Sequence, residues 1–317
     1  EPEMVSENSE LYRKHPDWCL QMPRRQPSRG RYQLVLDLSR DDVRDYIVTS
    51  INGVLDSAQI EYVKWDMNRF ITDAWSAIVE KEKQGEIYHR YILGLYDIMN
   101  RIILTHPEIL FCGCSGGGGR FDPGMLYYQP QIWCSDNTDA VCRLKIQYGT
   151  TFVYPVSAME SHVSVCPNHQ TGRTVPLGTR GVTAMDGILG YELDSTKLTK
   201  EEKRICREQV EAYKKNYPLI VYGDYYRLTN PYTFSEYVAW EHVSPGRDEA
   251  LISLVLTEKE ANDAQRYVKA KGLNPRMQYR VDGMEGSLSG QALMSAGLPV
   301  PGNLLQYESV QYHIRAL

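Results

Sequence analysis

EYVKWDMNR (residues 61–69) and WCSDNTDA (residues 133–140) are the two stretches that decide the fold of this chain. Each begins as a short apolar strand and places carboxylates at the carboxyl end of that strand. Because side chains alternate along a strand, Lys64 and Asp66 share one face. Asp136 directly follows the second strand. Two carboxylates that face one pocket are the minimum equipment for cleaving a glycosidic bond.

Strand and helix patterns alternate around these two stretches. The sequence predicts strands at 33–38, 60–66, 108–114, 131–135, 150–158 and 185–193. It predicts helices at 41–55, 86–104, 139–149 and 199–217. Such alternation is typical of an α/β fold with a parallel sheet. Polar residues gather at the carboxyl ends of the strands, where (β/α)8 barrels carry their chemistry.

The pattern changes near residue 229. Strand-like runs at 232–244, 249–258, 277–283 and 310–317 are separated by turns rich in Pro, Gly and Asp. No long helix pattern lies between them, which predicts an antiparallel, β-sandwich-like domain. We therefore expect two domains, a catalytic (β/α)8 barrel at 1–228 and an antiparallel β domain at 229–317.

Composition excludes several function classes. The 317 residues carry a net charge of -5, which argues against a broad nucleic-acid surface. No apolar run is long enough to span a bilayer, so we expect no membrane partner. Seven cysteines at irregular spacing favour reduced thiols and a cytoplasmic protein over a disulfide framework.

The number of predicted strands falls short of a closed barrel. Six barrel strands are expected, whereas closure of this fold needs eight. The chain also opens at EPEMV (residues 1–5) without an initiator Met. We therefore expect that it lacks its own beginning, so that the barrel is incomplete.

The chain resembles the bacterial α-galactosidases of glycoside hydrolase family 36. The resemblance rests on motifs that occur in the family's order: EPEMV (1–5), HPDW (15–18), RYQLVLDL (31–38), KWDMNR (64–69), CSGGGGRFDPGMLYY (114–128), WCSDNTDA (133–140), RLKIQYGT (143–150), PVSAMESHVS (155–164), PNHQTGR (167–173) and GYELD (190–194). That family has an N-terminal β-sandwich, a (β/α)8 barrel and a C-terminal antiparallel β domain. The resemblance begins near the end of the second barrel strand, which implies that the first strand and most of the second are missing.

The resemblance also implies roles for individual residues. Asp66 matches the family's nucleophile and Asp136 its general acid/base, so we expect double displacement with retention of configuration. No metal or cofactor is implied. The positions that match the family's substrate-binding residues are Arg31, Lys64, Trp65, Asn68, Cys114 and Gly117.

Several residues have a structural interpretation that we prefer. Asp139 is expected to cap a helix rather than to act as a second acid. Cys112 and Cys114 are expected to be buried thiols, because their Cys-x-Cys spacing does not fit structural zinc. Glu1 and Glu3 are interpreted as hydrogen-bond partners rather than catalytic carboxylates.

Three functions remain open at this point. The first is a retaining exo-α-galactosidase that acts on raffinose-type oligosaccharides and melibiose. The second is an α-galactosyl transferase that uses the same covalent intermediate, and the third is a non-catalytic sugar-binding fragment. The resemblance implies an α-galactoside oligosaccharide as partner and a homo-oligomer, a tetramer, for the full-length protein. Because part of the family's sugar site would be missing, we expect residues 1–317 alone to have little or no activity.

Overall fold

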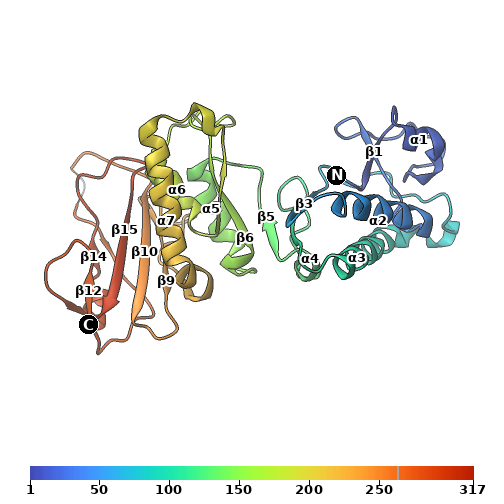
Figure 1. Cartoon of the computed structure of the whole chain (residues 1–317). Coiled ribbons are helices and arrows are strands. Elements are labelled where there is room, and N and C mark those ends of the chain that lie inside the picture. The colour runs from blue at the N-terminus through green and yellow to red at the C-terminus, as the bar shows by residue number, and fades with distance from the viewer. Residues whose placement is uncertain (263) are drawn as a thin grey trace. The chain divides into compact units, whose positions relative to one another are not determined.

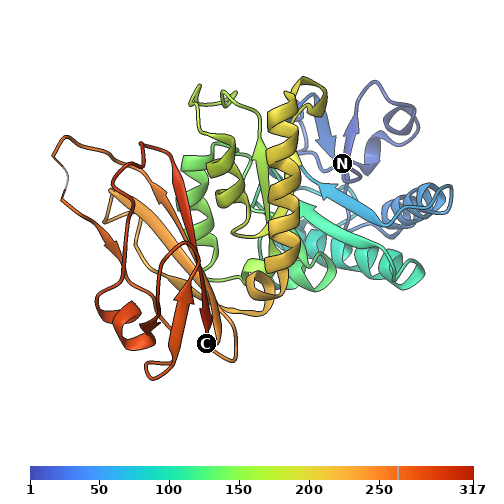
Figure 2. The same cartoon turned by 60° about the vertical axis from the view of Figure 1, so that its left-hand side comes forward.

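The computed structural model of the chain describes residues 1–262 and 264–317. It divides into two compact units, Glu1–Asp136 and Asn137–Leu317, and each is described by itself (Figures 1 and 2). Each unit encloses its own buried apolar clusters. No helix in the described ranges is long and apolar enough to cross a lipid bilayer.

The first unit is built on parallel strands. β4 (Leu110–Cys114) pairs in parallel with β3 (Tyr62–Asp66) on one side and with β5 (Gln131–Trp133) on the other. In this register Asp66 lies opposite Cys114. The carboxyl ends of the three strands therefore meet at one edge of the sheet, as the sequence predicts.

Two helices of this unit, α2 (Asp41–Leu55) and α3 (Ile87–Thr105), lie side by side (Figure 1). α3 buries apolar residues at helical spacing, which are Tyr91, Leu95, Ile98 and Ile102. Gly94 lets α3 approach the chain closely, since a Cβ there would lie 2.0 Å from the carbonyl oxygen of Leu38. The smaller elements are α1 (Glu10–Lys14), α4 (Pro123–Tyr128) and 3-10 helices at Pro16–Trp18 and Lys81–Glu86.

The strand expected at 33–38 does not join the parallel sheet. β2 (Gln33–Val35) pairs antiparallel with β1 (Met4–Ser6), with Met4 opposite Val35. A short apolar run predicts a strand but does not reveal the direction of its partner. Arg31 and Tyr32 at positive φ, 52° and 62°, turn the chain into β2.

The second unit begins with helices and a further parallel pair. Its first elements are α5 (Ala140–Thr150), β6 (Met159–Ser164), α6 (Leu177–Ala184), β7 (Ile188–Glu192) and α7 (Lys200–Tyr222), with 3-10 helices at Val156–Ala158 and Ser195–Lys197. β6 and β7 pair in parallel.

The strand expected at 150–158 is wrong. α5 continues through Thr150, and the strand is β6 instead. Of the apolar residues that suggested a strand, Phe152 and Val153 are 62% and 71% exposed, whereas Tyr154 and the 3-10 helix Val156–Ala158 bury theirs without joining any described sheet. The β-branched and aromatic residues of 150–158 therefore predicted a strand at a place where the chain does not pair with any of the described strands.

An antiparallel sheet fills the rest of the second unit. Its strands, in spatial order, are β13 (Leu288–Ser289), β12 (Gln278–Val281), β15 (Ser309–Ala316), β10 (Glu249–Leu256), β9 (Tyr237–Val243) and β8 (Asp224–Arg227). A separate pair, β11 (Tyr267–Val268) and β14 (Leu298–Pro299), and a short helix, α8 (Gly290–Ser295), accompany it. The four strands predicted here are confirmed.

The antiparallel sheet begins earlier than the expected domain boundary. β8 starts at Asp224 and pairs with β9, whereas the sequence places the boundary at 228/229. α6 and α7 contact this sheet at its central strands (Figure 2). β9 is buried along its whole length, and its alternate side chains enter two different apolar clusters.

Glu241 is a buried carboxyl group on the apolar face of β9. It lies between Ala239 and Val243, and one oxygen accepts the backbone N–H of Lys271 at 2.7 Å. Its other oxygen has no hydrogen-bond partner among the described residues. Burial raises the pKa of Glu241 to about 8.

We predict that Glu241→Gln stabilises the protein at alkaline pH. The unfolded carboxyl ionises near its ordinary pKa of 4.5, whereas the folded one keeps its proton up to about pH 8. The folded state thus binds more protons between these values, and its stability falls as the pH rises. Urea unfolding at pH 5, 7 and 9 should show that the free energy of unfolding of the variant, relative to that of the wild type, increases with pH up to about pH 8. The increase should be on the order of 3 kcal/mol. A gain that is the same at all three pH values would contradict the argument.

Candidate active site

Asp66, the last residue of β3, is held in place by its own strand end. Its Oδ1 accepts the backbone N–H of Met67 at 2.8 Å, and its Oδ2 accepts the side-chain amide of Asn68 at 2.7 Å. Lys64 lies two residues earlier on the same face, as the alternation predicts. The carboxylate is therefore oriented by two donors and has a cation on its own face of the strand.

Asp136 follows β5 and is held by a tryptophan. The indole N–H of Trp133 donates to Asp136 Oδ1 at 3.1 Å. The Lys64 ammonium lies 5.1 Å from the centre of the Trp133 ring. Lys64 and Trp133 therefore connect the surroundings of the two aspartates. Sequence reasoning missed Trp133, although a buried indole needs an acceptor and Asp136 comes three residues later.

A glycine turn after β4 contacts both segments that carry the aspartates. Gly117 has φ +82°, and a Cβ there would lie 2.8 Å from Ser135 Cα and 2.9 Å from the amide nitrogen of Asp136. On the other side, the Ser115 hydroxyl donates to the carbonyl of Met67 at 2.9 Å. Only glycine fits at 117, both for its backbone conformation and for its close approach.

Cys114 ends β4 between the two aspartate-bearing strands. Burial, together with the neighbouring Asp66 carboxylate and against a backbone hydrogen bond from Gly117, raises the pKa of its thiol to about 12. Cys114 is therefore a neutral thiol beside Asp66. All seven cysteines are free thiols, as predicted. No cluster of His, Cys, Asp and Glu suited to a metal ion occurs in the described residues.

Trp65 does not lie with the other predicted sugar-site residues. Its side chain is 2% exposed and donates its indole N–H to Glu3 at 2.8 Å. As the neighbour of Lys64 and Asp66 along β3, it points to the opposite face of the strand. The structure places it in the apolar core with α3, which the strand alternation itself predicts.

Glu3 is the acceptor at the centre of this buried network. It is 0% exposed and also accepts from the Tyr91 hydroxyl at 2.6 Å and from both terminal nitrogens of Arg120 at 2.5 and 2.7 Å. Burial alone raises the pKa of Glu3, but the Arg120 charge and the hydrogen bonds outweigh it and lower the pKa. The prediction that Glu3 is a hydrogen-bond partner is confirmed.

Glu1 brings Arg31 close to Asn68. One Glu1 oxygen accepts from Arg31 Nη1 at 2.8 Å and also from the Asn68 side-chain amide. Asn68 in turn donates to Asp66. Arg31 is therefore connected to the nucleophile candidate through two side chains, although it precedes its own strand.

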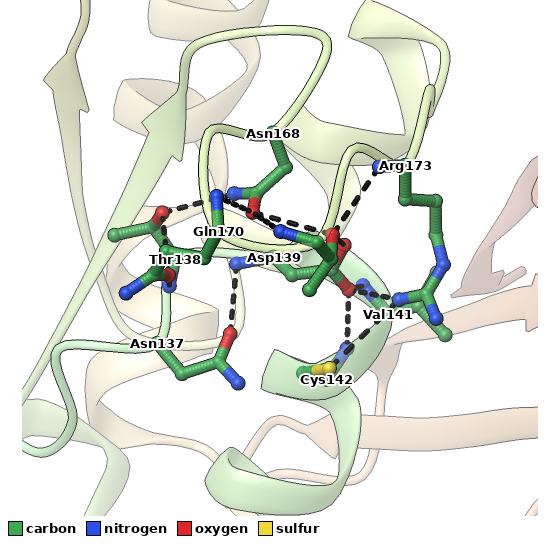
Figure 3. Close-up of polar contacts among 9 residues, drawn as sticks. Asn137, Thr138, Asp139, Val141, Cys142, Asn168, Gln170 and Arg173 are labelled. Atoms are coloured by element: carbon green, nitrogen blue, oxygen red, sulfur yellow. Dashed lines mark hydrogen bonds and ion pairs between the residues drawn. The ribbon is translucent and has the colours of Figure 1, made fainter.

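Asp139 caps α5, as predicted. Its side chain accepts hydrogen bonds from the backbone N–H groups of Val141 and Cys142 (Figure 3). It also accepts hydrogen bonds from the Thr171 hydroxyl and the Arg173 guanidinium. Burial alone raises the pKa of Asp139, but these donors outweigh it and lower the pKa. A carboxylate with all these donors is a structural anchor rather than a proton donor.

Two family models match the chain. Residues 1–223 match the model described as Melibiase, and residues 237–314 match the Glycosyl hydrolase family 36 C-terminal domain. The gap between the two matches contains β8, the first strand of the antiparallel sheet.

Curated relatives and solved structures match over the whole chain. It is 54% identical to alpha-galactosidase AgaA of Geobacillus stearothermophilus and 46% identical to alpha-galactosidase Mel36A of Lactobacillus acidophilus, in each case over 317 residues. The crystal structure of AgaA superposes with a TM-score of 0.97, and variants of AgaA in complex with raffinose or stachyose also give 0.97. The chain spans 43% of the length of both curated relatives.

We predict that Arg120→Met destabilises the first unit strongly. The change leaves the Glu3 carboxylate buried without its counter-charge, which costs about 3–5 kcal/mol. Thermal or urea unfolding of the variant measures the loss. Arg90→Met is the matched control, because Arg90 pairs with Glu86 on the exposed surface of α3, where such a pair contributes less than about 1 kcal/mol. Equal losses in the two variants would refute the role of the buried pair.

Proposed function

This chain belongs to glycoside hydrolase family 36, and we propose that it carries both catalytic carboxylates of a retaining exo-α-galactosidase. The substrates are terminal α-galactosides of the raffinose and melibiose type. The observation that carries the proposal is the placement of Asp66 and Asp136 at the carboxyl ends of β3 and β5, with β4 between them. Because the chain spans 43% of the curated relatives, the proposed activity is that of the whole protein.

Asp66 acts as the nucleophile. Its carboxylate, oriented by the Met67 amide and the Asn68 side chain, attacks the anomeric carbon of galactose. The bond to the leaving oxygen breaks as the bond to Asp66 forms, which gives a galactosyl-enzyme ester. Water then attacks the same carbon and releases galactose and the free carboxylate.

Asp136 acts as the acid/base. It gives its proton to the leaving oxygen in the first step and takes a proton from water in the second. The indole N–H of Trp133 binds Oδ1. This bond fixes the rotation of the carboxyl group, so that the proton is presented in one direction.

The strand spacing supports a retaining mechanism. Neighbouring strands lie about 4.8 Å apart, so the backbones of β3 and β5 are separated by roughly 10 Å. Side chains that lean toward each other from such strands reach the separation of about 5–5.5 Å that retention needs.

The variants of AgaA give further support. The raffinose complex has one aspartate replaced by asparagine, and the stachyose complex has another replaced by alanine. These two positions are as far apart in the AgaA sequence as Asp66 and Asp136 are here.

The remaining residues of the site suit a galactose with a free 2-hydroxyl. Lys64 donates to sugar hydroxyls from the Asp66 face of β3. The Cys114 thiol and the Gly117 backbone close the site at the end of β4, which leaves room for a hydroxyl rather than an N-acetyl group. Arg31 and Asn68 contribute from the adjoining loop.

We expect residues 1–317 assayed alone to hydrolyse little or no substrate. β3 pairs with β4 and, within the described ranges, with no second strand. Asp66 and Lys64 therefore lie on an edge strand, and a sugar bound there would be covered on one side only.

The stereochemistry of hydrolysis tests the mechanism. We predict that the whole protein, incubated with an aryl α-galactoside, first releases the α-anomer of galactose, as proton NMR can follow. Asp66→Asn should give no product while its circular dichroism stays unchanged. Release of the β-anomer would exclude a retaining mechanism.

Leaving-group dependence tests the role of Asp136. Asp136→Asn should lower kcat/KM for melibiose and raffinose by about 10²–10⁴-fold, because their alkoxide leaving groups need a proton. An activated nitrophenyl α-galactoside should lose far less. Undiminished hydrolysis of raffinose by this variant would show that another group is the acid.

A further inference from the structure

We propose that Arg173 is a positioning residue for the acid/base. Arg173 connects the segment that follows Asp136 to the C-terminal antiparallel sheet. The inference rests on the proposed function of Asp136. It extends that function to a residue distant in sequence, on the loop between β6 and α6, and to the domain that carries no catalytic carboxylate.

The first observation is the anchoring of Asp139 by Arg173. Asp139 is 0% exposed and lies three residues after Asp136. It forms an ion pair with Arg173 Nη1 and accepts the Thr171 hydroxyl at 2.7 Å. Among the ion pairs of the described residues, Arg173 supplies the only full counter-charge to this fully buried carboxylate.

The same loop also holds Thr138, which lies two residues after Asp136. The side-chain oxygen of Gln170 accepts the backbone N–H of Thr138 at 2.9 Å, and the Asn168 amide donates to the Thr138 hydroxyl at 3.0 Å (Figure 3). Asn137 accepts the backbone N–H of Asp139 at 3.1 Å. The loop at 168–173 therefore holds Thr138 and Asp139, two and three residues after the acid/base.

The second contact of Arg173 lies in the C-terminal domain. Its guanidinium carbon lies 5.5 Å from the centre of the Tyr307 ring, within cation–π range. Tyr307 has φ 66°, and its backbone N–H donates to the carbonyl of Leu256 at the end of β10 at 2.7 Å. The ring is thus placed by the central strand of the antiparallel sheet.

Removal of Arg173 is expected to cost stability, because it leaves the buried Asp139 carboxylate without its counter-charge, and also to loosen the segment that follows Asp136. The Asp139 cap on α5 persists without Arg173, because Val141 and Cys142 still donate their amides. The loop and the segment at 137–139 then lose their charged connection. A displacement of about 1 Å at a catalytic group can cost on the order of 10²-fold in rate.

Arg173→Met in the whole protein tests the proposal. We expect kcat/KM for melibiose to fall about tenfold or more, because the leaving group of melibiose needs a well-placed acid. The value of kcat/KM for a nitrophenyl α-galactoside, whose leaving group needs no such acid, should fall by less than about threefold. Arg173→Lys keeps the charge and should recover part of the melibiose rate. Tyr307→Ala should show the same selectivity more weakly, and Tyr307→Phe, which keeps the ring, should resemble the wild type.

Arg204→Met is the matched control, because Arg204 makes only exposed ion pairs with Glu201 and Glu208 on α7 among the ion pairs of the described residues. It should change neither rate. If Arg173→Met does not fold, Tyr307→Ala becomes the deciding variant, since it leaves the buried ion pair in place.

Two outcomes separate this inference from the proposed function. The positioning role would be overturned if Arg173→Met and Tyr307→Ala lowered kcat/KM equally for both substrates, or for neither, and Asp136→Asn were still selective. A wild-type protein without α-galactosidase activity, or an unselective Asp136→Asn, would instead refute the proposed function.

Discussion

The buried carboxylate of Glu3 is the interaction on which the first unit depends. Removing an ionised carboxylate from water costs several kcal/mol, and the attraction of a counter-charge offsets this only when the geometry is good. Here a bidentate Arg120, Tyr91 and Trp65 all donate to it. Trp65 lies between Lys64 and Asp66 in β3, and Arg120 ends the glycine turn. One carboxylate thus fixes the strand that bears Asp66 and the turn that follows β4.

The glycine turn extends this constraint to the second aspartate. Gly117 packs directly on the backbone at Asp136, and Ser115 bonds the backbone next to Asp66. Backbone contacts of this kind leave no freedom for side-chain adjustment, so they hold two catalytic groups more rigidly than side-chain contacts would. The neutral Cys114 thiol fills the space beside Asp66 without adding a competing charge.

Asp139 has the corresponding role after Asp136. Both anchors are fully buried carboxylates paired with an arginine that is distant in sequence, Arg120 for Glu3 and Arg173 for Asp139. Each lies within a few residues of a proposed catalytic group, or next to a strand that carries one. Asp66 is half-buried and Asp136 is exposed, whereas the carboxylates of Glu3 and Asp139 are enclosed. Burial therefore separates the two roles among acidic residues that look alike in the sequence.

The sequence by itself determined the helices α2, α3, α5 and α7, the strands β3, β4 and β5, and the positions of Asp66, Asp136 and the Asp139 cap, because periodicity and capping are local properties. It did not predict the shorter helices α1, α4, α6 and α8. It misplaced the strand at 150–158 and assigned Trp65 to the sugar site. It also missed the hydrogen bond from Trp133 to Asp136 and the contacts of the loop at 168–173. Only the tertiary structure decided that β2 pairs with β1, that Glu3 accepts from Trp65 and Arg120, and that Arg173 reaches Asp139. These contacts join residues far apart in the chain, and no local pattern encodes which distant partner a buried charge will meet.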